Sequence, residues 1–249
     1  MTKTPLPPHP TLLRYYQKDA DRAAMVRDLF DQGANDYEWI CRVMSLGTGG
    51  HYRKQALLSA GFTPGMRLLD VATGTGPVLR AAVEGSLGKG LVVGLDPSRG
   101  MLNECRKACA APLYQGRGEK LPFMDGSFDM VSMGYALRHV PDLRELFVEY
   151  RRVLKPGGRV VILEITQPRS RAGRWLNRLY LRGLVPSLAR FGTQGPAASR
   201  MMEYFWDTIE TCVPPESILD ALSEAGLVET NRATTAGIFS AYTAQKPQR

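Results

Sequence analysis

The sequence predicts an α/β fold in which a mostly parallel sheet carries helices on both faces. Three observations lead to this prediction. A short apolar run passes through Asp70 into a glycine-rich turn at residues 73–76, as a buried strand does before a helix. From Met66 onward, strand and helix patterns alternate. A second strand pattern ends at Asp96, another acid at the edge where parallel strands bind ligands.

The first part of the chain is expected to be helical. Residues 1–10 are rich in proline and lack an apolar signal core, which predicts a flexible N-terminus. Residues 11–62 should form a helical lid in front of the sheet. Its expected parts are a helix over 20–30, a polar break over 31–36, a helix from Tyr37 to a turn at 47–50, and a helix over 52–60.

Residues 63–168 should form the core of the fold. The expected elements are a strand at 67–71, a helix at 77–84, a strand at 91–95, a helix at 99–110, strands at 112–116 and 130–133, a helix at 143–153 and a strand at 159–164. Because parallel strands need crossover connections, this succession predicts a parallel sheet.

The last third is expected to return to the same sheet. Residues 169–214 form a basic segment, predicted to be an inserted helical cap. Residues 215–249 should then supply a helix at 215–225 and two strands at 228–232 and 239–244. A terminal hairpin beside five parallel strands gives a seven-stranded sheet.

Composition is typical of a soluble globular protein, with 44% hydrophobic and 22% charged residues among 249. No apolar run approaches the roughly 18 residues that span a bilayer. The four cysteines, Cys41, Cys105, Cys109 and Cys212, form no standard zinc pattern with histidines. We therefore expect reduced thiols, no metal and a cytoplasmic protein.

The glycine turn and Asp96 together indicate a nucleoside ligand. Gly74 and Gly76 allow close approach to a ligand or positive φ angles. Asp96 is placed to accept hydrogen bonds from both ribose hydroxyls. A third glycine at the dinucleotide spacing is missing, and so is the Lys-Ser/Thr pair that holds phosphates. A ligand that has a ribose but no pyrophosphate fits this pattern.

The core also carries motifs in a characteristic order. They are Asp70-x-x-x-Gly74-x-Gly76, Asp96, Glu119-x-Leu121-Pro122-Phe123, Phe128-Asp129 and Leu154-Lys155-Pro156-Gly157-Gly158. Over residues 66–165 this order resembles the class I S-adenosylmethionine-dependent methyltransferases, which have a Rossmann-like fold. The run from Arg152 to Thr166 is similar to the signature of the ubiquinone/menaquinone C-methyltransferase family.

This resemblance implies S-adenosylmethionine as cofactor and S-adenosylhomocysteine as product. It implies that the glycine turn, organised by Asp70, cradles the methionine part, that Asp96 holds the ribose, and that Gly134 lies beside the sulfonium. Pro97 and Met101 would lie against the adenine. The implied cofactor-binding residues are Asp70, Ala72, Thr73, Gly74, Thr75, Gly76, Asp96, Pro97, Met101, Arg117, Gly118 and Gly134.

Several positions depart from the family pattern. Arg117 stands where the family has an Asp or Asn at the adenine edge, and a guanidinium cannot accept a hydrogen bond there. Gly49 and Tyr52 replace a His and a Trp of the lid signature, and His139 replaces an Asn after Arg138.

The resemblance makes Arg138, His139 and Tyr37 the candidate catalytic residues. Arg138 could stabilise a phenolate or position a water, whereas its own pKa is too high for a base. His139 is either a base, since imidazole titrates near neutral pH, or a residue that only lines the substrate site. Tyr37 would close over the methionine end or touch the substrate.

The basic segment has a pattern of its own. Arg171, Arg174, Arg178 and Arg182 would form one stripe on a helix, beside Trp175, Leu176, Leu179 and Tyr180. Such a helix can lie in an anionic membrane interface, or it can cap the substrate with its arginines solvated. We expect no nucleic-acid partner, because leucines occupy the places where stacking aromatics would be needed.

The leading functional prediction is C-methylation of a small hydrophobic acceptor, a quinol or phenolic ring as in quinone biosynthesis. An O-, N- or C-methyltransferase of secondary metabolism is the first alternative, and a non-catalytic S-adenosylmethionine-binding protein the second. We also expect a homodimer and, through residues 169–190, peripheral contact with the inner face of the membrane.

Overall fold

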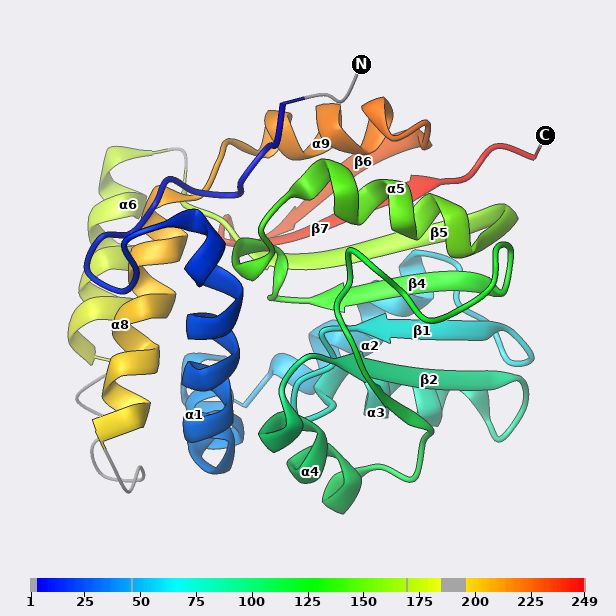
Figure 1. The fold of residues 1–249 in the computed structure, drawn as a ribbon, viewed down its shortest axis with the longest axis horizontal. Helices are drawn as coiled ribbons and strands as arrows, with labels where there is room; N and C mark the ends of the chain where they lie inside the picture. The colour runs from blue at the N-terminus through cyan, green and yellow to red at the C-terminus, as the bar shows by residue number, and fades with distance from the viewer. Residues whose placement is uncertain (1–3, 46, 169, 185–195, 249) are drawn as a thin grey trace.

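The computed structural model describes residues 4–45, 47–168, 170–184 and 196–248. These residues contain a seven-stranded sheet in the order β3-β2-β1-β4-β5-β7-β6 (Figure 1). The strands are β1 (Arg67–Val71), β2 (Leu91–Asp96), β3 (Leu113–Gln115), β4 (Phe128–Gly134), β5 (Leu154–Ile165), β6 (Val228–Thr235) and β7 (Phe239–Gln245). Strands β1 to β5 pair in parallel, and β7 pairs antiparallel with both β5 and β6. The predicted parallel sheet with a terminal hairpin is confirmed.

The central strands are buried on both faces, and successive side chains enter opposite layers. On β1, Leu69 and Val71 pack into one apolar cluster, whereas Leu68 packs into the other. Helices α5 and α9 cover the first face, and α2, α3 and α4 cover the second. Their bounds are α2 (Gly49–Ser59), α3 (Pro77–Ser86), α4 (Arg99–Ala108), α5 (Leu143–Val153) and α9 (Pro215–Glu224). This two-sided burial explains why the strands are nearly continuous apolar runs.

Two further helices stand beyond one end of the sheet. Figure 1 shows α1 (Arg22–Met44) beside α8 (Pro196–Thr211), at the end where α4 also begins. A third apolar cluster joins them, with Val26, Leu29 and Ile40 from α1 facing Met201 and Phe205 from α8. The α1–α8 pair forms a layer across the end of the sheet.

The expected break at residues 31–36 is wrong, because α1 runs without interruption from Arg22 to Met44. Gly33, one of the residues that suggested a break, lies inside this helix and serves its packing. A Cβ at this glycine would lie 2.9 Å from the terminal methyl of Met201, so Gly33 provides the space in which α8 packs closely. Its role is helix packing and not helix termination.

Other boundaries differ by smaller amounts. Helix α2 begins at Gly49, inside the stretch expected to be a turn, and β5 begins at Leu154, before the expected strand. The Lys155-Pro156-Gly157-Gly158 run is therefore part of the strand, with Gly157 at a φ of 75°.

The described residues of the N-terminal segment make specific contacts, although they form no helix or strand. The Leu6 N–H donates to Asp142 at 3.0 Å, and the Leu143 N–H donates to the Leu6 carbonyl. The Pro8 carbonyl accepts a bond from the Val213 N–H. These residues tie α5 to the segment before α9, which the proline-rich composition did not indicate.

The basic segment is described in part. Helix α6 (Arg171–Arg178) is followed by a π-helical turn, η3 (Leu179–Leu184), whose Tyr180 hydroxyl donates to the Val43 and Met44 carbonyls of α1. Arg169, Arg190 and the side chain of Arg182 lie outside the described residues. Among the helices described, none is long and apolar enough to span a bilayer.

Candidate active site

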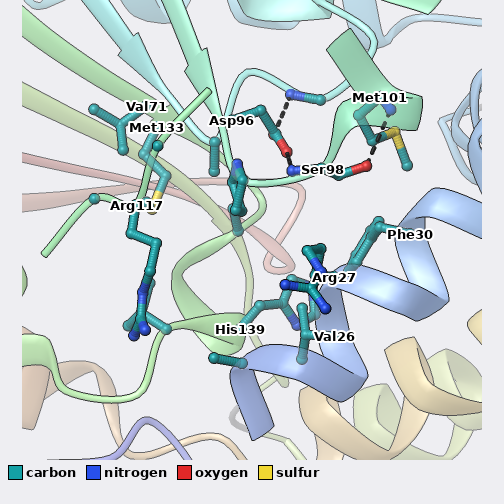
Figure 2. Close-up of a pocket in the computed structure, with 18 of the residues that line it drawn as sticks. Val26, Arg27, Phe30, Val71, Asp96, Ser98, Met101, Arg117, Met133 and His139 are labelled. Atoms are coloured by element: carbon teal, nitrogen blue, oxygen red, sulfur yellow. Dashed lines mark hydrogen bonds between the residues drawn. The ribbon is translucent and has the colours of Figure 1, made fainter. Parts of the chain in front are cut away.

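A cavity of about 530 Å³ lies between α1 and the carboxyl ends of the central strands. This volume is within the usual range of small-molecule sites. The predicted site residues that line it are Tyr37, Ala72, Gly74, Asp96, Pro97, Met101, Arg117, Gly118, Gly134 and His139. Figure 2 shows Asp96 and Ser98 on one side and Val26, Arg27 and Phe30 of α1 on another.

The turn after β1 is shaped by glycine. Gly74 and Gly76 have φ angles of 58° and 88°, and Gly76 also packs so tightly that a Cβ would lie 2.6 Å from the Cys105 sulfur. Thr73 donates its hydroxyl to Asp70 at 2.7 Å, and Ser132 donates to the other Asp70 oxygen at 2.6 Å. Asp70 therefore links the turn, through Thr73, to β4, through Ser132, and it does not line the cavity.

Thr73, Thr75 and Gly76 also lie outside the cavity lining. The Thr75 hydroxyl is buried, with no hydrogen-bond partner within the described part of the chain. It is thus a polar atom available to a ligand that reaches along the turn.

Asp96 lies at the end of β2 with both oxygens in use. The Gly74 N–H donates to Oδ2 at 2.8 Å, and the Ser98 N–H donates to Oδ1 at 2.8 Å. Burial raises the pKa of this carboxyl from the usual 3.8 to about 6, and the two N–H donors act in the opposite direction. The carboxylate links the two loops that border the cavity, and its remaining lone pairs can accept ribose hydroxyls.

A second acid, Asp31, was missed in the sequence because it fell in the expected break. Its Oδ1 accepts hydrogen bonds from the Ser98 hydroxyl at 2.6 Å and from the Gly100 N–H at 2.8 Å. Ser98 in turn caps α4 by accepting from the Met101 N–H. Asp31 therefore fastens α1 to the loop that carries Asp96.

The far end of the cavity is bordered by the loop after β3. Arg117 is exposed and pairs with Glu119 at 3.3 Å, and both residues line the cavity. A Cβ on Gly118 would lie 2.7 Å from Leu146 and 3.0 Å from Val71, so only glycine fits there. Its backbone stays accessible to a planar ligand edge.

His139 lies in an aromatic enclosure at the opposite end. Its ring stacks on Tyr204 and Phe205, with centroids 5.3 and 5.8 Å apart, and meets Phe30 edge-on at 5.1 Å. Both ring nitrogens are buried without partners among the residues described. Burial holds the pKa of His139 well below its usual value, so the imidazole is neutral at physiological pH.

Tyr37 comes from α1 and contacts the glycine turn. Its ring lies 3.8 Å from the point where a Gly74 Cβ would be. Burial, together with the neighbouring Cys41 thiol, raises the pKa of its hydroxyl well above 10. Tyr37 is therefore a hydrogen-bond donor at neutral pH and cannot serve as a base.

Arg138 is not among the residues that line the cavity. Its guanidinium is buried, forms an ion pair with the buried Glu164 and donates to the Thr208 hydroxyl at 3.4 Å. It lies on the short 3₁₀ turn η2 (Leu137–His139), directly before His139. Because Arg138 and His139 are neighbours on η2, the contacts that fix Arg138 also fix the backbone that carries the His139 ring.

The chemical character of the cavity fits a nucleoside with a sulfur-containing side chain. An acid at a strand end, an apolar wall and a glycine turn with a partnerless hydroxyl supply what such a ligand needs. Residues that the sequence did not indicate complete the lining, among them Phe30, Ser98, Gln115, Met133 and Tyr135.

Comparison with known proteins gives consistent similarities. The profile of the ubiE/COQ5 methyltransferase family matches residues 17–246. A demethylmenaquinone methyltransferase of Symbiobacterium thermophilum is 33% identical over 220 residues, which cover 85% of this chain and 88% of that protein. The ubiquinone/menaquinone biosynthesis C-methyltransferase of Geobacter sulfurreducens is 32% identical over 91% of this chain and 90% of its own length.

Solved structures give the same fold at lower identity. A S-adenosylmethionine-dependent methyltransferase of Thermotoga maritima superimposes with a TM-score of 0.63 and 19% identity. The match covers 88% of this chain and 99% of that one.

Proposed function

This chain belongs to the ubiE/COQ5 methyltransferase family, and from that premise we propose that it methylates a ring carbon of a hydrophobic quinol. It is an S-adenosylmethionine-dependent methyltransferase. Relatives from Symbiobacterium and Geobacter carry names that specify demethylmenaquinone and ubiquinone/menaquinone biosynthesis. One observation supports the same acceptor class here: the cavity that holds Asp96 also holds His139 among apolar rings.

We assign a role to each residue around the cofactor half of the cavity. Asp96 accepts the ribose hydroxyls, while Pro97 and Met101 border the adenine. Gly118 offers its backbone to the adenine edge, and Arg117 lies beside it. Ala72 and Gly74 line the methionine end, Asp70, Thr73, Thr75 and Gly76 shape the turn behind them, and Gly134 borders the sulfur. S-adenosylmethionine supplies a methyl carbon that is activated by its positively charged sulfur.

The acceptor half is assigned to His139, Tyr37 and the surrounding rings. A phenol becomes a carbon nucleophile as it loses its hydroxyl proton, and the unprotonated ring nitrogen of His139, which has no partner among the described residues, can accept that proton. Because the neutral imidazole is favoured by burial, it first accepts a hydrogen bond and takes the proton only as the ring attacks. The ring hydrogen then leaves as a proton to water, and the phenolate regains its proton from His139, which restores the aromatic phenol and the neutral imidazole.

Arg138 is proposed to position His139 and not to touch the acceptor. Its ion pair with Glu164 fixes η2, the turn that carries His139. We propose that α1 is the part of the 11–62 lid that covers both halves, since α2 packs on the sheet. In the described part of the segment 169–214, α8 is proposed to cap the acceptor side, because its Tyr204 and Phe205 stack on His139.

A reaction with defined acceptors tests the proposed function. Purified protein is incubated with methyl-labelled cofactor and reduced demethylmenaquinone, a demethylated ubiquinol precursor, or a catechol. Mass spectrometry should find a ring-methylated quinol. His139→Phe keeps an aromatic ring in the enclosure and should lower kcat at least about tenfold, as loss of a general base does. An O-methylated product, or cofactor binding without any turnover, would contradict the proposal.

We also propose that α6 contacts an anionic membrane surface. Trp175, Leu176 and Leu179 are more than half exposed, and Arg171, Arg174 and Arg178 are exposed on the adjacent side. A helix with this pattern can lie in the interface of a bilayer that contains its hydrophobic acceptor. Flotation with vesicles of phosphatidylcholine, with and without phosphatidylglycerol, should show binding to anionic vesicles that Trp175→Ala with Leu179→Ala removes. A homodimer stays a prediction, which analytical ultracentrifugation would check.

A further inference from the structure

Arg53 is a mostly buried arginine that has no carboxylate partner among the described residues. Its side chain belongs to α2 and the residue is 8% exposed. In the part of the chain that the structure describes, its Nε has no hydrogen-bond partner and no carboxylate forms an ion pair with it. Its closest aromatic neighbour is Tyr135, whose ring centre lies 5.1 Å from the Arg53 Cζ. The two Nη groups are not enclosed by protein, because Arg53 lines a cavity, and they can receive an anion from a ligand.

Arg53 lies at the methionine end of the cofactor site. It lines a second cavity, of about 300 Å³, on the other side of the glycine turn. Gly74 and Tyr37 line the first cavity. Pro77 and Cys41, which follow them closely in the sequence, line the second. Tyr135, under the Arg53 guanidinium, lines the first cavity. Arg53 therefore lines the second cavity and contacts, through Tyr135, a residue that lines the first.

The charge of Arg53 acts on groups around the turn. Burial raises the pKa of Asp70 to about 6, and the positive charge of Arg53 opposes that rise. The same charge also opposes the increase in the pKa of Tyr37. Other groups around the second cavity have other partners or are solvated: Arg80 pairs with Glu38, and Arg42, Lys54 and Glu84 are exposed.

Gly49 makes this placement possible. A Cβ at Gly49 would collide with the Arg53 Nη1, so the guanidinium occupies the space that any other side chain would need. Gly49 is also the position where the family signature was expected to carry a histidine. The departure from the family signature at Gly49 therefore leaves the space that the Arg53 guanidinium occupies.

We propose that Arg53 binds the carboxylate of the methionine moiety of S-adenosylmethionine. A guanidinium and a carboxylate form the strongest common type of charge-assisted hydrogen bond. The glycine turn between the two cavities also carries Thr75, whose buried hydroxyl has no hydrogen-bond partner among the described residues. This proposal rests on the cofactor assignment and does not depend on which acceptor is methylated.

Two ligands that differ by one carboxylate test the proposal. Isothermal titration calorimetry measures S-adenosylhomocysteine and its decarboxylated analogue against wild type, Arg53→Gln, Gly49→Ala and Arg42→Gln. Arg42→Gln removes an exposed positive charge from the same cavity and serves as the matched control. Gly49→Ala keeps Arg53 but displaces its guanidinium.

Arg53→Gln and Gly49→Ala should bind S-adenosylhomocysteine about 10–100-fold more weakly than wild type and bind the decarboxylated analogue unchanged. Wild type should prefer the carboxylated ligand by the same factor, and Arg42→Gln should behave like wild type. Binding of the analogue also verifies that each variant is folded.

Equal losses for both ligands, or a wild-type protein without preference between them, would overturn the assignment of Arg53. These outcomes are separate from failure of the quinol assay. A protein that shows the carboxylate preference but methylates no quinol overturns the proposed acceptor alone.

Discussion

At the scale of single residues, Asp96 is the acceptor best placed for a ribose. Asp96→Asn keeps the size of the side chain and replaces one acceptor by a donor. We expect the affinity for S-adenosylhomocysteine and for 5′-methylthioadenosine to fall about 10–100-fold, since hydrogen bonds to a charged group contribute roughly 1.5–3 kcal/mol. Calorimetry checks this, with the exposed Asp220→Asn of α9 as control. Retained affinity for both ligands would exclude a ribose contact.

The raised carboxyl pKa values of Asp96 and Asp70, each about 6, also predict a pH dependence of stability. Between about pH 4 and pH 6 the folded protein holds protons that the unfolded chain has released. The stability contributed by these two groups is therefore fully present below about pH 4 and is lost as the pH rises through about 6.

Without added cofactor, Asp96→Asn should therefore be more stable than wild type at pH 8, by about 1–3 kcal/mol, and nearly equal to it at pH 4.5. Melting temperatures at the two pH values measure the difference. A variant less stable than wild type at pH 8 would mean that the lost N–H contacts outweigh the relieved charge.

Arg138 and Glu164 form a buried pair whose structural and catalytic roles can be separated. Arg138→Met alone leaves the Glu164 carboxylate without its cation and should cost about 3–5 kcal/mol of stability. Arg138→Met with Glu164→Leu should recover most of this loss. If the double variant also regains turnover, Arg138 acts only through the position of η2; if stability returns and turnover does not, the guanidinium has a chemical role.

At the scale of elements, α1 shows where local sequence signals mislead. Asp31, Gly33, Asn35 and Asp36 are residues typical of loops, so the pattern indicated a break. Tertiary contacts reverse that indication, because Gly33 provides space for Met201 of α8 and Asp31 accepts two hydrogen bonds from the start of α4, at Ser98 and Gly100. Neither partner is near in sequence, and no local pattern could have revealed them.

The Asp31 contact predicts how firmly α1 covers the cavity. Asp31→Ala removes the acceptor for Ser98 and Gly100, so α1 should open more often. We expect faster amide hydrogen exchange in residues 22–35 and about 3–30-fold weaker S-adenosylhomocysteine binding, from the loss of roughly 1–2 kcal/mol. Asp28→Ala, on the same helix with Arg27 as its exposed partner, is the matched control. Unchanged exchange in Asp31→Ala would contradict this role.

At the scale of the whole molecule, the parallel core was predictable because strand and helix patterns alternate along it, although the strand order was not predicted. The glycine turn, Asp96 and the apolar strands define the parallel core without reference to distant partners. The site was predictable mainly on that core, and Tyr37 of α1 is the predicted lining residue from outside it. Asp31, Phe30 and Arg53 come from helices packed against it, and their contribution depends on long-range contacts that spacing cannot encode.

The N-terminal segment joins parts of the molecule that are distant in sequence. Besides the bonds of Leu6 and Pro8, the His9 carbonyl accepts from the buried guanidinium of Arg22 at 3.0 Å. Deleting residues 2–9 should therefore lower stability by about 2–4 kcal/mol, since each lost bond to a buried group contributes about 1 kcal/mol. Chemical denaturation measures this, and hydrogen exchange at Val213 should increase. An unchanged denaturation midpoint would show that these bonds contribute nothing.

The pairing of α1 with α8 has a consequence during synthesis. The ribosome releases α1 first, but its apolar partner emerges only after all five parallel strands have left the exit tunnel. Until then Val26, Leu29 and Ile40 lack the surface that covers them in the finished fold. We expect the nascent core to hold its cofactor only weakly, and the growing chain to bind chaperones until α8 is complete.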